Sequence, residues 1–494
     1  MRRDLVDVVI VGGGAAGCVL ARRLGEGGRS VLLLEAGPDL GDRAGPALLD
    51  GWRNPRGPEW TTDWGYQSEP GAEGDADKLR RGKLLGGTSW LTRFAVRGHP
   101  ADFDAWAGRG NPGWSFAEVL PSFRRLEADA DFGDEPWHGN IGPITISRYG
   151  TLRRSAIHEA AVDALIGLGF PAIEDHNAPE AVGAGPMPMS TRDGRRLTTL
   201  KAYLQSDAPP PSSLRIDADR QVDKVLVEGG RALGVRLVDG TEVAAASVIL
   251  SAGTYGSPPL LMRSGVGPAA HLREMGIDVV VDLHGVGENL ADHPGTDLDA
   301  GFGGEAGCEA LRHTIATYRS RSQPADGPPD LMFWVHEPSE DDGRLYLDPF
   351  LLKPESRGTV RLRSADPLDP PRINLPGLRV ERDVERLMEG YELGLAIANH
   401  PAVRALAEEP GPATRSAPGE LRERVVTNAY SLPHVVGTCR MGPSPDAGDV
   451  VDAAGRVYGV DGLRVIDASV IPDAPSGFPH LVTIMVAEHL AQGL

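Results

Sequence analysis

Two hydrophobic patterns alternate near the start of the chain. Residues 8–11 form a continuous apolar, β-branched run, which is typical of a strand buried on both faces of a parallel sheet. Small and apolar residues at helical spacing follow at 15–24, and residues 30–34 form a second apolar run. This order predicts a strand, a helix and a second parallel strand, the unit from which α/β sheets are built.

Similar patterns recur along the chain and divide it into blocks. Residues 214–256 predict a β-meander that ends in a buried strand. In residues 297–433 the pattern changes, and it predicts strands joined by loops. A last buried strand is predicted at 463–466. Helical periods are found at 155–169, 383–398, 421–428 and 481–490.

The chain therefore starts and ends in strands of one sheet, and a second domain is inserted between them. We expect a nucleotide-binding domain built from residues 1–145, 196–296 and 434–494, with a lid segment near the end of its first part. The inserted substrate domain would comprise residues 146–195 and 297–433. A chain of 494 residues with 41% hydrophobic side chains is large enough to bury sizeable cores.

A glycine-rich turn separates the first predicted strand from its helix. Gly12, Gly14 and Gly17 have the G-x-G-x-x-G spacing, and Glu35 follows the second predicted strand. In a dinucleotide site such glycines permit a tight turn and close approach of the backbone to a pyrophosphate, while the acid accepts the ribose hydroxyls. A glycine turn can also serve packing alone, but the order of strand, turn, helix, strand and acid favours a dinucleotide. The motif does not distinguish NAD from FAD.

Charge and composition limit the ligands and partners that we expect for this chain. The chain has 69 acidic and 50 basic residues and a formal net charge of −19, which argues against a nucleic-acid partner because phosphate binding requires a basic surface. No set of His, Cys and Asp residues has metal-ligand spacing, so we expect no metal. The three cysteines are too scattered for a disulfide framework or a zinc site: Cys18, Cys308 and Cys439.

The sequence favours a cytoplasmic location. Arg2 and Arg3 before an apolar run resemble the start of a secretory signal, but Asp4 and Asp7 interrupt that run and the glycines end it inside a folded motif. No later stretch is long and apolar enough to span a bilayer, so we expect no membrane span.

Ordered motifs along nearly the whole chain resemble those of the glucose–methanol–choline (GMC) flavoprotein oxidoreductase family. Besides GGGAAG with Glu35, they are LLGGTS at 84–89, GTYGSPPLLMRSGVG at 253–267, DHP at 292–294, SRGTVRLRSADPLDPPRI at 356–373 and the tail from 434 to 490. The resemblance implies an α/β fold with a Rossmann-like FAD-binding domain of the p-hydroxybenzoate-hydroxylase and glucose-oxidase type, and an inserted α+β domain around an antiparallel sheet. It also implies an enzyme that oxidises an alcohol, a CH–OH donor, to a carbonyl by hydride transfer to FAD.

The resemblance assigns roles to individual residues. His434 matches the family's catalytic histidine, and His480 matches a second active-site position that is His or Asn in different members. A histidine of near-neutral pKa is a natural acceptor of the hydroxyl proton, and a second one can hold the hydroxyl in place. The alternative for His480 is a helix-capping or packing role. Cofactor binding would fall to Gly12, Gly14, Gly17, Glu35, Gly86, Thr88, Val222, Asp467 and Ala468.

Departures from the family pattern concern the flavin and the substrate. Leu91 lies near the position at which some members attach the flavin through a histidine, so we expect non-covalent FAD. Thr92 stands where many members have Asn. The segment 292–329 is short and rich in Gly, Ser, Arg and Glu, which predicts a wide, wet entrance. We therefore expect a bulky, polyhydroxylated or glycosylated alcohol, or a peptide-derived redox carrier, rather than methanol or choline.

Two other functions stay open at this point. A GMC-fold lyase or another non-redox enzyme would keep FAD as a structural element. A flavin-binding protein without catalytic activity is disfavoured by the presence of histidines at both expected positions. The sequence leaves the identity of the substrate, the electron acceptor and the oligomeric state undetermined.

Overall fold

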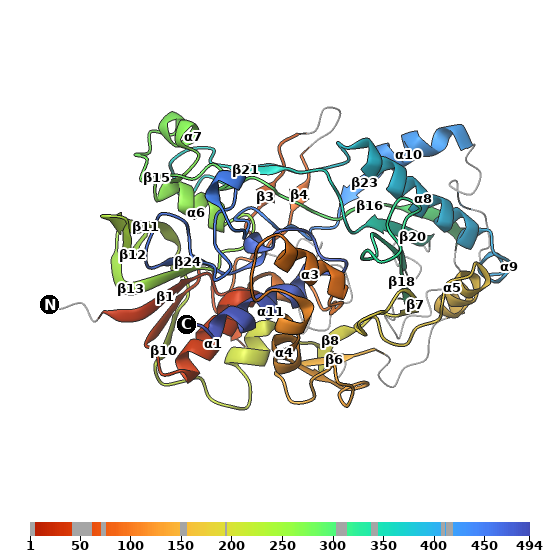
Figure 1. Ribbon diagram of the computed structural model, residues 1–494, viewed down its shortest axis with the longest axis horizontal. Helices are drawn as coiled ribbons and strands as arrows, with labels where there is room; N and C mark the ends of the chain where they lie inside the picture. The colour runs from red at the N-terminus through yellow and green to blue at the C-terminus, as the bar shows by residue number, and fades with distance from the viewer. Residues whose placement is uncertain are drawn as a thin grey trace.

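The computed structural model of the protein contains two seven-stranded sheets that lie in different halves of the molecule (Figure 1). The sheet that contains β1 lies on the side where the N-terminus is found, and the sheet that contains β20 lies toward the opposite end. The structure describes residues 5–41, 62–70, 76–148, 156–192, 195–302, 314–336, 344–406, 411 and 418–494.

The first sheet has the strand order β10-β2-β1-β13-β12-β11, with β24 paired to β13. Strands β10, β2, β1, β13 and β24 run parallel, whereas β11, β12 and β13 form an antiparallel meander. The predicted apolar runs form β1 and β2 and are buried, as expected for central parallel strands. The bounds are β1 (Val6–Val11), β2 (Val31–Leu34), β10 (Leu214–Asp217), β11 (Val222–Glu228), β12 (Arg231–Leu237), β13 (Glu242–Leu250) and β24 (Leu463–Val465).

The predicted meander is wrong at its first strand. Residues 214–217 form an edge strand parallel to β2, at the opposite end of the sheet from β11. The backbone has a positive φ of 55° at Asp219, between these two strands. Pairing with β10 satisfies the outer backbone groups of β2, which is buried on both faces and would otherwise be an open edge. The hairpin turns predicted at 228–230 and 239–240 are confirmed.

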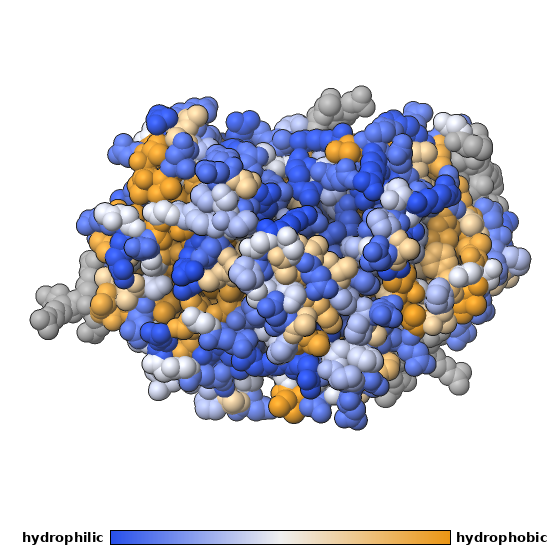
Figure 2. Space-filling model, viewed as in Figure 1, coloured by the Kyte–Doolittle hydropathy of each residue, from blue (hydrophilic) through white to orange (hydrophobic). Residues whose placement is uncertain are grey.

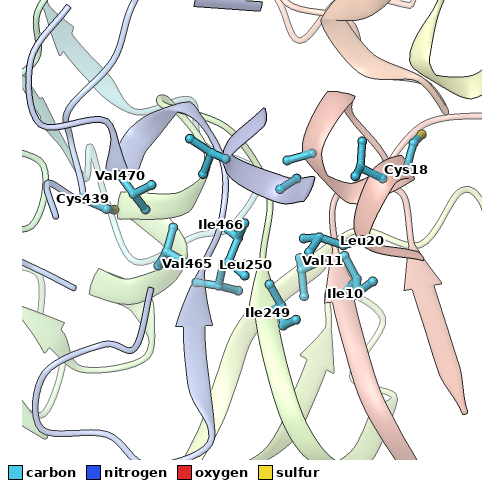
Figure 3. Packing of buried hydrophobic residues seen from close by; sticks show 14 of the residues in the cluster. Ile10, Val11, Cys18, Leu20, Ile249, Leu250, Cys439, Val465, Ile466 and Val470 are labelled. Atoms are coloured by element: carbon cyan, nitrogen blue, oxygen red, sulfur yellow. The ribbon is translucent and has the colours of Figure 1, made fainter. Parts of the chain in front are cut away.

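One hydrophobic core joins the first and last parts of the chain (Figure 3). Helix α1 (Ala15–Glu26) packs on β1 and β2, and α11 (Pro479–Ala491) packs against α1. Ile10 of β1, Ile249 of β13 and Val465 of β24 come from three distant parts of the sequence and share this core (Figure 3). Each such buried side chain contributes roughly 1.5–3 kcal/mol, so packing ties the C-terminal segment to the glycine-rich N-terminus.

The second sheet is antiparallel throughout, with the order β23-β16-β20-β19-β18-β7 and β17 beside β20. Helix α8 (Glu381–Ala398) packs on β20, β19 and β17, and α10 (Leu421–Thr427) packs on α8. Helix α5 (Ala156–Gly167) contacts β7, β18 and α9 (Pro401–Arg404). The strands are β7 (Gly183–Pro186), β16 (Pro294–Thr296), β17 (Leu298–Phe302), β18 (Thr314–Tyr318), β19 (Leu331–Val335), β20 (Arg344–Leu351) and β23 (Ala429–Ser431).

The two sheets confirm the predicted fold class, a Rossmann-like sheet joined to an inserted antiparallel α+β unit. The four predicted helical periods are found as α5, α8, α10 and α11. Strand β16 belongs to the second sheet, although the sequence analysis placed its residues in the first domain. The domain boundaries themselves stay a prediction.

Smaller elements complete the fold. Strands β5 (Glu127–Asp129), β6 (Ile144–Ser147), β8 (Met189–Arg192) and β9 (Arg195–Arg196) form a four-stranded sheet. Among the described residues, the other α-helices are α3 (Pro100–Gly108), α4 (Phe116–Leu126), α6 (Ser257–Arg263) and α7 (Ala269–Glu274). The short strand pairs are β3 (Tyr66–Gln67) with β4 (Lys78–Leu79), β14 (Val266–Gly267) with β15 (Val281–Asp282), and β21 (Thr359–Arg361) with β22 (Arg372–Asn374). Short turns of other helical types are Gly87–Trp90, Leu200–Leu204, Pro418–Glu420, Pro445–Ala447 and Ala468–Val470.

The surface carries mainly hydrophilic residues on the face seen in Figure 2, and hydrophobic groups gather toward the two ends of that view. Over the described ranges, no helix has both the length and the apolar character that crossing a membrane requires. Cys18 and Cys439 are buried free thiols, and Cys308 lies outside the described residues.

Candidate active site

The first glycine turn is shaped by close backbone contacts. Gly12 has a φ of +101°, and a Cβ atom there would lie 2.6 Å from the carbonyl oxygen of Ser251. A Cβ atom on Gly17 would lie 1.9 Å from the carbonyl oxygen of Gly12, so only glycine permits this packing of α1 on the turn.

The N-terminus of α1 is open to a ligand. Its N-cap residue, Gly14, provides no side-chain cap, and the first turn contains no acidic residue. A Cβ atom on Gly14 would meet nothing within 4 Å, so the backbone faces open space. Free N–H groups, the positive end of the helix dipole and room for close approach fit the pyrophosphate of a dinucleotide.

Glu35 lies at the end of β2, directly behind this turn. Its Oε2 accepts a hydrogen bond from the backbone N–H of Gly13 at 2.8 Å, and its Oε1 accepts one from Gly37 at 2.9 Å. Burial raises the pKa of this carboxyl group to about 7, although the backbone N–H groups oppose the shift. Glu35 therefore fixes the shape of the turn, and carboxylate lone pairs remain for a ribose.

The second predicted glycine turn contacts the first. The N–H of Gly86 donates to the carbonyl of Gly13 at 2.8 Å, and a Cβ atom on Gly87 would lie 2.8 Å from the Cα of Gly14. Thr88 follows in the 3₁₀ turn and is half-buried. Two motifs that are distant in sequence thus form one glycine-lined surface.

Asp467 follows β24 and holds two further turns of the chain together. Its Oδ2 accepts from the N–H of Gly253 at 2.8 Å and from the hydroxyl of Ser257 at 2.6 Å. Its Oδ1 accepts from the N–H and hydroxyl of Ser469 at 2.8 and 2.5 Å. The buried carboxylate therefore holds the turn of Gly253 against the turn that begins at the half-buried Ala468.

Val222 lies farther along the same sheet, at the first position of β11, and pairs with Leu237 of β12. Its side chain is buried, so a ligand at this end of the sheet would meet its backbone rather than its side chain.

His434 lies in the loop after β23 and is held from two sides. Its backbone N–H donates to Oδ1 of Asp292 at 2.7 Å. Its ring packs edge-on against Phe478, with 4.7 Å between centroids, and its Nδ1 lies 3.1 Å from Nδ1 of His293. Burial, then His293 and Arg81, hold the pKa of His434 well below its ordinary value, so the ring is neutral near pH 7.

His480 is the second residue of α11. Phe478 is the N-cap of this helix, and neither a side-chain cap nor an acidic residue is found in its first turn. Because Phe478 contacts the His434 ring, the start of α11 lies on the same side of the site as His434. Burial, followed by Arg196, lowers the pKa of His480 to about 4.

Aromatic side chains from three parts of the chain gather next to His434. The centroid of Phe94 lies 4.8 Å from that of Trp334 and 5.5 Å from that of Phe478, and the last two are 6.1 Å apart. Phe94, Tyr430 and Leu432 are partly exposed where they pack on this cluster. Aromatic side chains therefore flank His434 on the Phe478 side, whereas His293 and Asp292 contact it elsewhere. The wet entrance that segment 292–329 predicts stays a prediction, because residues 303–313 lie outside the described residues.

His138, to which the sequence assigns no role, lies in a buried ionic cluster. Its Nδ1 lies 2.8 Å from Oε1 of Glu127, and its Nε2 lies 2.9 Å from Oδ2 of Asp175. Arg97 donates to Glu127, and Arg148 donates to Asp129 and Asp175. Glu127, Asp129 and His138 lie close enough together to share a cation, but the two guanidinium groups already pair with these carboxylates.

A large hollow of about 880 Å³ lies elsewhere, between α1, α4 and the turn after β5, and none of the predicted site residues line it. Its wall mixes both signs of charge: Arg22, Arg124, Arg125, Arg192, Asp134 and Glu135. The chemistry that the sequence predicts is thus located at the glycine turns and the histidines instead.

Comparisons with known proteins agree with this geometry. Residues 6–295 and 354–487 match the N-terminal and C-terminal domains of GMC oxidoreductases. A 5-(hydroxymethyl)furfural oxidase from Methylovorus sp. (strain MP688) is 35% identical over 533 aligned residues that cover 100% of this chain and 99% of that protein. An oxygen-dependent choline dehydrogenase from Brucella suis biovar 1 is 35% identical over 98% of this chain and 94% of its own length.

Structural similarity leads to the same family. The crystal structure of pyridoxine 4-oxidase from Mesorbium loti superposes with a TM-score of 0.88, at 32% identity, over 99% of both chains. The glycine turns, the uncapped start of α1 and the space in front of Gly14 fit FAD, the cofactor that the resemblance implies. With both halves of the family matched across most of its length, the chain is an FAD-dependent enzyme of the GMC oxidoreductase family.

Proposed function

We propose that this enzyme oxidises the alcohol of a hydroxymethyl group on a flat aromatic ring to an aldehyde, with His434 as the proton acceptor and His480 positioning the hydroxyl. The observation that carries the proposal is the contact of the His434 ring with Phe478 inside the cluster that also contains Phe94 and Trp334. A flat ring would stack on Phe94, the partly exposed member of these three, and aromatic pairs contribute about 0.5–1.5 kcal/mol beyond the area they bury.

The cofactor would be held by the residues that the sequence motifs select. Gly12, Gly14, Gly17 and the start of α1 would bind the pyrophosphate, and Glu35 the adenosine ribose. Gly86, Thr88, Asp467 and Ala468 would line the path toward the flavin ring, and the backbone of Val222 would meet adenine. Bound FAD supplies the acceptor for the hydride that leaves the alcohol carbon.

His434 would remove the proton that the alcohol must lose. As hydride leaves the carbon, the O–H bond breaks and an N–H bond forms on the histidine ring. The lowered pKa of His434 supports this role because the ring is unprotonated, and ready to accept, at neutral pH. General base catalysis of this kind contributes about 10²–10⁴-fold.

His480 would hold the hydroxyl so that its carbon is presented correctly. Its place in the first turn of α11 supports this role, because the helix N-terminus also favours the negative charge that develops in the reaction.

Two relatives are named for ring alcohols, 5-(hydroxymethyl)furfural and pyridoxine, and this agrees with an aromatic substrate. Another is named for choline, and aromatic rings also bind quaternary ammonium groups through cation–π contacts. A bulky or glycosylated alcohol, the expectation from segment 292–329, has less support, because Phe478, a member of the aromatic cluster, packs against the His434 ring.

The test is anaerobic mixing of the holoenzyme with a panel of alcohols while flavin absorbance is recorded. Benzyl alcohol and 5-(hydroxymethyl)furfural should bleach the flavin quickly and at low concentration. Choline and a glycosylated alcohol should act weakly. Faster bleaching by either of these two would overturn the substrate class, and absence of bleaching by every alcohol would favour a lyase or another non-redox function.

A further inference from the structure

We propose that His293 is a positioning residue that holds His434 in the tautomer with its proton on Nδ1 and leaves Nε2 as the proton acceptor. This inference rests on the proposed role of His434. His293 belongs to the DHP motif and would not touch the reacting atoms, because it lies behind His434 on the Nδ1 side.

The geometry between the two rings allows one arrangement of protons at a time. Nδ1 of His293 and Nδ1 of His434 are 3.1 Å apart, and the ring planes are perpendicular at 89°. Only one hydrogen fits between two nitrogens at this distance, so one ring donates and the other accepts.

Asp292 holds the backbones of the two histidines close to each other. Its Oδ1 accepts from the backbone N–H of His293 at 2.8 Å and from that of His434 at 2.7 Å. Its Oδ2 accepts from the hydroxyl of Ser431. A single buried carboxylate thus clamps two chain segments that are 141 residues apart, and the contact between the rings is built into the fold.

The surroundings of His293 decide which ring donates. Nε2 of His293 is buried and has no hydrogen-bond partner among the described residues. The backbone carbonyls of Pro475 and Leu352 lie near this ring and favour its protonated form. Since carbonyl oxygens only accept and Nδ1 faces His434, we assign the hydrogen of neutral His293 to Nε2. His293 is then an acceptor at Nδ1, and His434 must be the donor.

Charges around the pair favour two neutral rings. Burial, and then Lys353, lower the pKa of His293 to about 3, although Asp473 on the same side opposes the shift. On the His434 side, Arg81 acts in the same direction as burial. Asp292, whose own pKa is raised by burial, faces the backbone of both histidines. Neither ring therefore carries a second proton near neutral pH.

The consequence for the reaction is direct. With hydrogen fixed on Nδ1, the remaining nitrogen of His434 has a free lone pair and can take the hydroxyl proton. Once protonated, His434 keeps its Nδ1–H bonded to His293, which stabilises the cation without a second buried charge. In the opposite tautomer Nε2 would carry hydrogen and could not act as a base.

Three variants of the holoenzyme test this arrangement. His293→Asn keeps an oxygen near the position of Nδ1 and can accept, whereas His293→Leu cannot. Loss of a group that orients a functional histidine costs about 10- to 100-fold in comparable sites, so His293→Leu should slow anaerobic flavin reduction by that factor and shift its pH profile. His293→Asn should recover most of the loss. His400→Leu, at the cap of α9, is the matched control.

A second measurement is independent of activity. In protein labelled with [¹⁵N]histidine, ring nitrogens with and without hydrogen have separate ranges of ¹⁵N chemical shift. The signals of His434 are assigned because they disappear from the spectrum of His434→Asn. Wild type and His293→Asn should show hydrogen on Nδ1 of His434, and His293→Leu should show a mixture or the other tautomer.

The outcomes separate this inference from the proposed function. Hydrogen on Nε2 of His434 in the wild type, or an unchanged pH profile and tautomer in His293→Leu, would overturn the positioning role even if alcohols reduce the flavin. If no alcohol reduces the wild-type flavin, the proposed function fails, while the NMR result still reports on the histidine pair.

Discussion

At the scale of single residues, Glu35 serves both the fold and the cofactor. Its carboxylate accepts hydrogen bonds from Gly13 and Gly37, and the motif places it at the ribose. Glu35→Ala should therefore weaken FAD retention by about 1.5–3 kcal/mol, or roughly 10- to 150-fold in Kd, more than it slows flavin reduction in the enzyme that still holds FAD.

Equilibrium dialysis against FAD measures this change. Glu26→Ala is a suitable control, because this exposed carboxylate on α1 pairs with arginines and does not face the glycine turn. Equal FAD affinity in Glu35→Ala and wild type would show that the adenosine binds elsewhere.

His480 can be separated from His434 by the chemistry of its substitutes. The amide of His480→Asn can still hydrogen-bond a hydroxyl, so flavin reduction should fall by less than about 10-fold, whereas His480→Ala should lose about 10²-fold or more. His489→Asn, at the far end of the same helix, should behave as wild type. Equally large losses in the Asn and Ala variants would indicate acid–base work at His480 instead of positioning.

At the scale of secondary-structure elements, a buried ionic cluster joins β5 to the segments that precede and follow it. His138 contacts carboxylates through both ring nitrogens, and Asp175 and Glu127 raise its pKa despite the opposing effect of burial. The pKa of Glu127 is lowered, because Arg97 and His138 outweigh the effect of its burial. The cluster is therefore most stable when His138 is protonated and Glu127 is ionised.

His138→Leu should destabilise this region by about 3–5 kcal/mol, because the three carboxylates of Glu127, Asp129 and Asp175 would then share only the two guanidinium groups of Arg97 and Arg148. The raised pKa means that the stabilisation is fully present below the ordinary value of 6.5 and is lost as pH rises through the folded value. The lowered pKa of Glu127 keeps its own contribution present above the ordinary value of 4.5. The difference in thermal midpoint between wild type and variant should thus be largest from pH 4.5 to 6.5 and shrink at alkaline pH.

The matched control is His284→Leu, at an exposed histidine, which should change stability by no more than about 0.5 kcal/mol. A difference between wild type and His138→Leu that grows with rising pH would contradict a protonated His138.

The sequence predicts where helices and strands lie better than it predicts which of them are neighbours in the fold. The apolar runs and helical periods locate β1, β2, α8 and α11 because they depend on local patterning. The pairing of β10 with β2 could not be read from the sequence, because a short edge strand has the same pattern in a meander.

Glycine turns and His434 were recognisable as motifs. The aromatic cluster was not, because Phe94, Trp334 and Phe478 meet only in three dimensions. His293 lies in the DHP motif, but nothing in that motif predicts its contact with His434.

At the scale of the whole molecule, the cofactor surface is assembled from distant parts of the chain that share one core. Leu91, near the position of flavin attachment in some family members, cannot form a covalent bond to it. Acid precipitation should therefore release all FAD into a yellow supernatant. Flavin that stays with the pellet would contradict non-covalent binding.

Binding across separated segments should also stabilise the folded molecule. At a free FAD concentration 100-fold above Kd, linkage adds about 2.7 kcal/mol, so the thermal midpoint should rise as FAD is added to protein from which it was removed. A midpoint that does not depend on FAD would indicate that the glycine turns do not form its site.

The measurement that tests the central claim most directly is the rate of anaerobic flavin reduction by an aromatic alcohol in wild type and His434→Ala, at equal FAD content. The control is His284→Ala, at an exposed histidine of the same chain. If His434 accepts the hydroxyl proton, His434→Ala should keep FAD bound and reduce it about 10²–10⁴-fold more slowly, while the control matches wild type. Reduction of the flavin in His434→Ala at the wild-type rate would contradict the account.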